Sequence, residues 1–256
     1  MHATSSTLGT LYLVPTPLDF GCDAHAPIDH ALPTQTLQVA AKLSHWISEN
    51  AKSTRAFLKR VGEVTPLAQP IQSLSIQELP REVHKKGDHR SDFDATPLLA
   101  AAQQGHDMGL VSEAGMPAVA DPGSSVVRAA HALGMRVVPL VGPVSLMLAL
   151  AASGLNGQNF AFVGYLPQEA SARLQRLREL ETLAHKTGQT QLFIETPYRN
   201  AALWEALLKG LQPHTRLARA SGLTLPDMQV QSQTVKAWRG QAVTHSDRPT
   251  VYALGL

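Results

Sequence analysis

The sequence predicts an α/β protein built from two α/β/α domains. Two reversals rich in Gly and Pro, at 109–123 and 137–145, each connect an apolar strand to an apolar helix. Strands and helices alternate through the first half, which is the order that gives a mainly parallel sheet. Strands outnumber helices in the second half, so its sheet is expected to be mixed. The expected boundary near Gly142 gives an N-terminal domain of residues 1–141 and a C-terminal domain of residues 142–256.

Short apolar runs bounded by turn residues predict the strands of the first half, and apolar residues spaced three or four apart predict its helices. Ser53 is expected to cap one helix, and Asp121-Pro122 the start of another. The polar stretch 81–94 is expected to be an exposed loop. In chain order the expected elements are strand 11–14, helix 33–43, strand 44–48, helix 53–60, strand 73–78, helix 95–104, strand 108–112, a helix from Asp121 to Gly134, and strand 136–141.

The second half is predicted by the same two patterns. Helix 144–153 is apolar nearly all round and is therefore expected to be buried. Helix 170–183 is amphipathic and is expected to lie on the surface of a sheet. The remaining expected elements are strand 160–163, strand 191–194, helix 200–208, and strands 215–220, 233–238 and 250–254.

Composition narrows the class of protein. The chain has 256 residues, 44% hydrophobic and 16% charged, which fits a folded protein with a sizeable core. The net charge of +2 permits a nucleic-acid partner without predicting one. The single Cys22 excludes an internal disulfide and fits a reducing cytoplasm. We expect no signal peptide, because residues 1–6 show no basic region followed by an apolar core. We expect no membrane partner, because the longest apolar run is far below the ~20 residues that span a bilayer. The 11 histidines are scattered, so no metal site is expected.

The two Gly-Pro reversals are the candidate ligand site. A strand, a turn and a helix bring bare backbone N–H and C=O groups to the carboxyl ends of parallel strands, where small ligands bind. Neither reversal carries a nucleophile or a cluster of metal ligands. This pattern predicts an enzyme whose cofactor is held mainly by main-chain groups.

Four segments, 12–17, 112–123, 137–145 and 162–167, resemble in order the tetrapyrrole-methylase superfamily of S-adenosylmethionine-dependent methyltransferases. The most similar branch methylates a cytidine ribose 2′-hydroxyl of small-subunit ribosomal RNA. Its Glu-Asp-Thr-Arg and Tyr-Glu-Ser/Thr-Pro-His-Arg blocks have counterparts here at 49–55 and 194–199. The resemblance implies a cofactor in a cleft between the two domains, a cytoplasmic homodimer, and ribosomal RNA or a ribosomal subunit as the partner.

The resemblance also implies roles for individual residues. A ribose hydroxyl must lose its proton as it is methylated, so Glu49 and Glu195, with Arg199, are the expected catalytic residues, reaching the acceptor side. Arg55 and Arg199 suit phosphate contacts, and Lys85, Lys86 and Arg90 could form a phosphate-binding arm. The expected residues for S-adenosylmethionine are Pro15, Thr16, Pro17, Ser112, Ala114, Gly115, Met116, Gly142, Pro143, Val144, Leu166 and Pro167.

The chain departs from this branch at Leu18-Asp19-Phe20, at Asn50, and at residues 221–225. All three departures fall in segments expected to face the acceptor. Two alternatives therefore stay open. One is a methyltransferase that acts on a tetrapyrrole or another small acidic molecule. The other is a degenerate relative that binds the cofactor, or nothing, and acts as an interaction protein.

Overall fold

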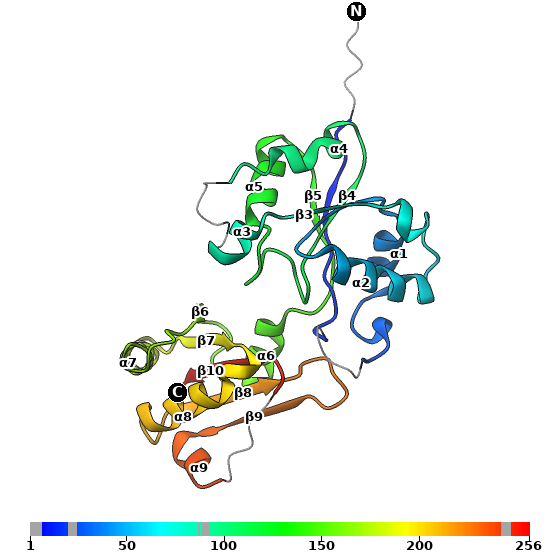
Figure 1. Cartoon of the computed structure of the whole chain (residues 1–256). Coiled ribbons are helices and arrows are strands. Elements are labelled where there is room, and N and C mark those ends of the chain that lie inside the picture. Colours follow the sequence, from blue (N-terminus) through cyan, green and yellow to red (C-terminus); the bar gives the residue numbers. More distant parts are fainter. Residues whose placement is uncertain (1–6, 20–24, 87, 89–92, 242–246) are drawn as a thin grey trace, which may run out of the picture. The chain divides into compact units, whose positions relative to one another are not determined.

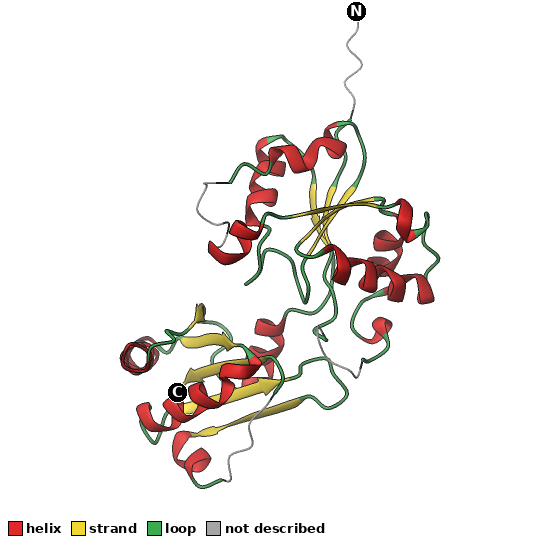
Figure 2. Ribbon diagram, in the orientation of Figure 1, coloured by secondary structure: helices red, strands yellow, loops and turns green. Residues whose placement is uncertain are grey.

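The computed structural model describes residues 7–19, 25–86, 88, 93–241 and 247–256 (Figure 1). Two compact units divide the chain between Val144 and Ser145. Each unit contains one sheet with helices, as Figure 2 shows. No helix in the described part of the chain is both long and apolar enough to cross a membrane.

The N-terminal unit contains an all-parallel, 5-stranded sheet in the order β3-β2-β4-β1-β5. The parallel sheet expected from the alternation of strands and helices is confirmed. The bounds of its elements are β1 (Leu11–Leu13), α1 (Thr34–Lys42), β2 (His45–Ser48), α2 (Ala51–Val64), β3 (Ser75–Glu78), α3 (Arg81–Lys86), α4 (Ala100–Gln103), β4 (Met108–Val111), α5 (Ser124–Ala132) and β5 (Val137–Pro139).

Alternate side chains of each strand enter opposite cores, as the pleat of a strand requires. In β2, Trp46 packs with residues of α1 and α2, whereas the next residue, Ile47, packs with residues of α4 and α5. The helices α1 and α2 therefore cover one face of the sheet, and α4 and α5 cover the other (Figure 1). This two-sided cover leaves the ends of the parallel strands as the place for a ligand.

Two helix starts differ from the prediction. The cap of α2 is Asn50, whose Oδ1 accepts the N–H groups of Lys52 at 2.9 Å and Ser53 at 3.3 Å. The Ser53 hydroxyl instead donates to the carbonyl of Asn50 at 2.9 Å. The prediction of Ser53 as the cap was wrong because the apolar pattern begins one turn later than the helix itself.

The helix α5 starts at Ser124, and the prediction that Asp121 caps it was wrong. The buried carboxylate of Asp88 accepts the N–H groups of Gly123 and Ser125, each at 2.8 Å, and the hydroxyls of Ser124 and Ser125, each at 2.7 Å. Burial raises the pKa of Asp88, but these hydrogen bonds outweigh burial and leave the pKa lowered. A cap supplied by a distant segment leaves no local sequence signal.

The stretch 81–94, expected to be an exposed loop, begins with the helix α3 and includes the buried Asp88. Val83 of α3 is also buried. The described part of this stretch therefore packs against the domain instead of extending into solvent. Arg90 lies outside the described residues, as do the side chains of Lys85 and Lys86.

The C-terminal unit contains a mixed, 5-stranded sheet in the order β6-β7-β10-β8-β9. Strands β6 and β7 are parallel and the other pairs are antiparallel, which confirms the predicted mixed sheet. The bounds of its elements are α6 (Ser145–Ser153), β6 (Phe160–Tyr165), α7 (Ala170–Thr187), β7 (Thr190–Glu195), α8 (Asn200–Gly210), β8 (Arg216–Ser221), β9 (Gln229–Thr234), α9 (Val235–Arg239) and β10 (Thr250–Gly255).

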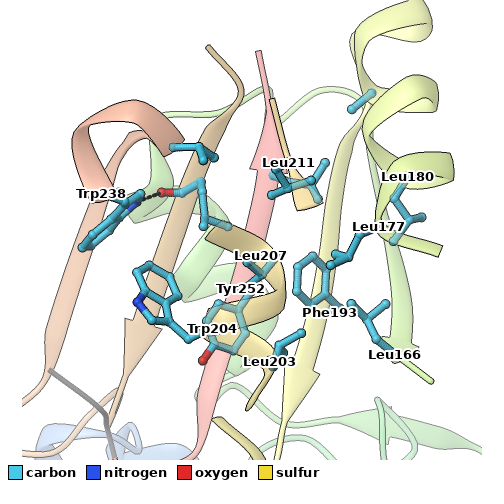
Figure 3. Close-up of a cluster of buried hydrophobic side chains, with 14 residues drawn as sticks. Leu166, Leu177, Leu180, Phe193, Leu203, Trp204, Leu207, Leu211, Trp238 and Tyr252 are labelled. Atoms are coloured by element: carbon cyan, nitrogen blue, oxygen red, sulfur yellow. Dashed lines mark hydrogen bonds between the residues drawn. The ribbon is translucent and has the colours of Figure 1, made fainter. Parts of the chain in front are cut away.

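Leucine and aromatic side chains form the main core of this unit (Figure 3). Phe193 of β7 stacks with Tyr252 of β10 at 5.7 Å between ring centres, and Trp204 of α8 meets Trp238 edge-on at 4.8 Å. The Trp238 indole N–H donates to the carbonyl of Leu217 at 2.8 Å, so this buried polar group is satisfied. The core joins α7, α8 and α9 to one face of the sheet, while α6 contacts β8, β9 and β10.

Two predictions for this unit were wrong. Residues 233–238 are not a strand: β9 ends at Thr234, whose hydroxyl accepts the N–H of Ala237 and caps α9. The helix α6 is not buried all round, since Met147 is 41% and Leu148 39% exposed. One face of α6, with Leu146 and Leu150, is buried, so the helix packs as a surface element despite its uniformly apolar sequence.

Candidate active site

The loops that follow β1 and β4 are joined at the carboxyl ends of these neighbouring strands. The N–H of Thr16 donates to the carbonyl of Gly115 at 2.9 Å, and the N–H of Gly115 donates to the carbonyl of Thr16 at 3.1 Å. The Thr16 hydroxyl also donates to the carbonyl of Ser112 at 3.4 Å. The segments 15–17 and 112–116, predicted separately as parts of one site, are therefore held together as one piece.

The loop after β5 joins the same group. A Cβ added to Gly142 would lie 2.3 Å from Cγ of Pro15, so a larger residue has no room there. A Cβ added to Gly115 would meet Cδ2 of Leu18 at 3.0 Å and the carbonyl oxygen of Pro143 at 3.7 Å. The sheet order β4-β1-β5 explains this convergence, because it places the three loops side by side at one edge.

The hydrogen bonds between loops also change the role expected of Gly115. Its N–H is already bonded to Thr16, so that group holds the loops together and is not offered to a ligand. The hydroxyl of Ser112 differs, because it is buried near the carboxyl group of Asp121 and forms no hydrogen bond of normal length with another described residue. A buried hydroxyl without a normal hydrogen bond is costly, and a polar ligand atom would satisfy it.

The backbone of the 112–123 turn is strained. Ala118 and Ala120 have φ angles of 64° and 66°, a region that costs a residue with a Cβ ~1 kcal/mol or more. Internal hydrogen bonds hold this shape: Ala118 N–H donates to the carbonyl of Pro122, and Val119 N–H to that of Met116, each at 3.3 Å. Strain of this kind concentrates at ligand sites.

Three carboxyl groups lie at this turn. The Oε2 atom of Glu49, which follows β2, accepts the N–H of Glu113 at 3.2 Å. The pKa of Asp121 is raised to about 7, first by burial and then by the negative charges of Glu49 and Glu113, while a hydrogen bond with the Ser112 hydroxyl opposes the rise. These three residues, which we name the acidic cluster, give the turn a negative electrostatic potential.

The acidic cluster contains two residues that the sequence reasoning missed. The sequence analysis gives Glu113 no role and interprets Asp121 as a helix cap. Two acidic residues within one Gly-Pro turn are nevertheless a signal in the sequence that could have indicated a charged site. Glu49 was expected to approach from the acceptor side, apart from the cofactor turn. In the structure, Glu49 contacts the turn itself. The sheet order β2-β4 places the end of β2 directly beside the turn.

Glu195 and Arg199, the other expected catalytic residues, lie in the C-terminal unit and bind each other. Oε1 of the buried Glu195 accepts hydrogen bonds from Nε of Arg199 and from the N–H of Thr196, each at 2.7 Å. The same oxygen forms an ion pair with Nη2 of Arg199 at 2.6 Å. With this oxygen so fully engaged, the pair suits positioning better than proton transfer. Of the two expected S-adenosylmethionine residues in the C-terminal unit, Leu166 lies in the hydrophobic core and Pro167 is exposed.

Each departure from the branch pattern has a structural role where it is described. Asp19 forms an ion pair with Arg60 of α2 at 2.8 Å, and Asn50 caps the same helix. In the segment 221–225, the Ser221 hydroxyl lies 2.9 Å from that of Thr250. Phe20 lies outside the described residues. The expected phosphate ligand Arg55 is exposed on α2.

Comparison with known proteins defines first the fold and then the family. The chain shares its two-domain α/β fold with the crystal structure of uroporphyrin-III-C-methyltransferase from Thermus thermophilus, at a TM-score of 0.52 and 17% identity over 96% of this chain and 94% of that one. The family model of the Tetrapyrrole (Corrin/Porphyrin) Methylases matches residues 44–237. The chain belongs to this family, and the resemblance found in its motifs is confirmed.

Curated relatives are proteins named ribosomal RNA small subunit methyltransferase I. That of Xylella fastidiosa (strain Temecula1) is 35% identical over 77% of this chain and 62% of the relative. That of Pseudomonas aeruginosa is 31% identical over 75% of this chain and 58% of the relative. That of Mesorhizobium japonicum is 30% identical over 89% of this chain and 68% of the relative. The matched region thus spans about three fifths of the first two relatives.

Proposed function

We propose that the chain is an S-adenosylmethionine-dependent methyltransferase that methylates a ribose 2′-hydroxyl of ribosomal RNA. Family membership and the names of the curated relatives support this proposal. The observation that carries it is the convergence of three loops at the carboxyl edge of the N-terminal sheet, one of which contains Glu113 and Asp121 of the acidic cluster. Small ligands bind at this edge of parallel sheets.

The residues at this edge fit S-adenosylmethionine. The molecule carries a sulfonium and an ammonium group, and the acidic cluster supplies the opposite charge. The buried hydroxyl of Ser112 offers a polar contact. Ser112, Ala114 and Met116 on one loop, and Gly142, Pro143 and Val144 on another, would hold the cofactor, while Pro15, Thr16 and Pro17 support both loops.

When bound, the cofactor supplies a methyl group on a positively charged sulfur. In the reaction that we propose, the ribose oxygen gains this methyl group and loses its proton. A carboxylate of the acidic cluster takes the proton, and Asp121 is suited to this because its pKa of about 7 lies near neutral pH. Glu49 holds the turn through the N–H of Glu113, so it also positions the site.

Labelled S-adenosylmethionine tests the proposal directly. The chain and the labelled cofactor are incubated in separate reactions with small ribosomal subunits, with total RNA or with a small-molecule extract. Label in ribosomal RNA, at a ribose, supports the proposal. Label in the small-molecule fraction would instead identify a methyltransferase of small acidic molecules, and cofactor binding without transfer to any fraction would identify an interaction protein.

A matched pair of variants tests the site. Glu49→Gln should lower both cofactor affinity and turnover, because Glu49 contacts the cofactor turn. Glu63→Gln, an exposed residue of α2, should change neither. Equal behaviour of the two variants would remove the acidic cluster from the site.

We also propose that the protein is a cytoplasmic homodimer, as the resemblance implies. Sedimentation equilibrium should then give twice the 27.5 kDa of one chain. A stable monomer at micromolar concentration would refute the homodimer.

A further inference from the structure

Two exposed tyrosines flank Arg199 in the C-terminal unit. The guanidinium carbon of Arg199 lies 5.7 Å from the ring centre of Tyr165 and 5.8 Å from that of Tyr198. Tyr165 is 52% exposed and Tyr198 is 82% exposed. Both distances fall within the range of a cation–π contact. We call these three residues the Tyr–Arg–Tyr group.

The backbone around this group is well fixed. Tyr198 and Arg199 belong to a 3-10 turn, Pro197–Arg199, in which the N–H of Arg199 donates to the carbonyl of Thr196 at 3.0 Å. The next residue, Asn200, is buried and donates to the carbonyl of Arg248 at 2.9 Å. On β6, a register irregularity between Phe162 and Tyr165 resets the strand just before Tyr165. Irregularities of this kind redirect side chains and are frequent near functional sites.

The charge of the group is already neutralised. Glu195 binds Arg199 through two nitrogen atoms at 2.7 and 2.6 Å, so the guanidinium is paired inside the protein. A phosphate would have to compete with this buried carboxylate for Arg199. What the group offers to solvent is therefore mainly aromatic surface beside a flat guanidinium.

We propose that the Tyr–Arg–Tyr group is a stacking platform for an unpaired nucleobase of the RNA acceptor, with Tyr198 as its most accessible ring. This inference rests on the proposed function and names the part of the substrate that the C-terminal unit binds. Unpaired bases stack on tyrosine rings and arginine planes in proteins that bind single-stranded RNA. A fixed backbone lowers the entropy that an exposed ring loses on binding. The internal ion pair distinguishes this platform from a phosphate site. Because the guanidinium charge is already paired, the contribution of the platform to RNA affinity should not depend on salt concentration.

The experiment compares wild-type protein with Tyr198→Ala, Tyr198→Phe and Phe160→Ala. Phe160 is the matched control, since it is an aromatic residue at the other end of β6 and is 38% exposed. Affinity is measured by fluorescence anisotropy for a labelled single-stranded oligoribonucleotide of mixed sequence and for the same strand in a duplex. Each titration is repeated at several salt concentrations, and S-adenosylmethionine binding is measured by calorimetry on the same preparations.

We expect Tyr198→Ala to weaken binding of the single strand by about 5- to 100-fold, the range for the loss of one stacked base. Its salt dependence and its cofactor affinity should equal those of wild type. Tyr198→Phe should restore binding because the ring is kept, the duplex should be little affected, and Phe160→Ala should behave as wild type.

Wild-type RNA affinity in Tyr198→Ala, or a loss that Tyr198→Phe does not restore, would overturn the stacking platform and leave the methyltransferase proposal standing. A flatter salt dependence in Tyr198→Ala would also overturn it, because it would mean that a phosphate contact had been lost. A wild-type protein that binds S-adenosylmethionine but no RNA would overturn both the platform and the RNA acceptor.

Discussion

Thr16 and Gly115 exchange two backbone hydrogen bonds, of 2.9 and 3.1 Å, although they belong to loops almost 100 residues apart in the chain. This antiparallel bridge joins the two loops beyond the carboxyl ends of the parallel strands β1 and β4. It fixes the turn that carries the acidic cluster to the loop that packs against Gly142. The geometry of the proposed cofactor site therefore depends on one residue, Gly115, at a φ of 78°.

Gly115→Ala should lower stability and abolish binding of S-adenosylmethionine. The positive φ costs an alanine ~1–2 kcal/mol, and the new Cβ would press on Leu18 at 3.0 Å and shift the bridge. Gly134→Ala is the matched control, because Gly134 has a φ of 72° with no atom within 4 Å of the added Cβ. The control should lose similar stability in thermal unfolding and bind the cofactor normally in calorimetry. Normal cofactor binding by Gly115→Ala would contradict the site assignment.

Asp121 should make the protein less stable as the pH rises from about 4 to about 7. Its pKa is about 7 in the folded protein and near 3.8 in an unfolded chain, so the folded state holds the proton over this range and the unfolded state does not. The stabilisation is complete below the unfolded pKa and is lost as the pH rises through the folded pKa. In thermal unfolding, Asp121→Asn should match wild type at pH 4 and exceed it at pH 8, whereas exposed Glu63→Gln should follow wild type throughout.

The same titration should control cofactor affinity. Ionised Asp121 adds a negative charge to the acidic cluster, so the affinity for cationic S-adenosylmethionine should rise as the pH increases through about 7. This rise should be absent in Asp121→Asn, measured by calorimetry from pH 6 to pH 8. A rise of equal size in the variant would show that another group is responsible.

Arg199→Ala should destabilise the C-terminal unit by about 3 kcal/mol, because it leaves the buried carboxylate of Glu195 without its cation. The side chains of this pair are 19% and 2% exposed. Arg176 and Glu179 form a control pair whose side chains are 42% and 49% exposed, and Arg176→Ala should cost less than about 0.5 kcal/mol. Urea unfolding measures both values, and equal losses would show that the Glu195–Arg199 pair contributes no more than a surface pair.

Asp88→Ala should cost about 2 kcal/mol or more, since four donors at the start of α5 lose their acceptor. The pKa of Asp88 is lowered in the folded state, so its stabilisation is present above pH ~4 and declines as the pH falls through the folded pKa. Asp94→Ala, which removes an exposed carboxylate bonded to Thr96, should cost less. Urea unfolding at pH 7 and pH 3 compares the variants, and a loss for Asp88→Ala that is as large at pH 3 as at pH 7 would contradict the cap.

The sequence by itself determined most of the elements, the parallel and mixed sheets, and the two Gly-Pro reversals, but it missed the helices α3 and α9. The features that it determined follow from local patterns: the spacing of apolar residues, and Gly or Pro where the chain reverses, as at Gly115 and Gly142. Only the tertiary structure decided which atoms meet. The cap of α5 by Asp88, the contact of Glu49 with Glu113, and the pairing of Glu195 with Arg199 depend on the folded positions of the side chains. The raised pKa of Asp121 has the same origin, because burial and neighbouring charges act through distance in space, which the sequence does not record.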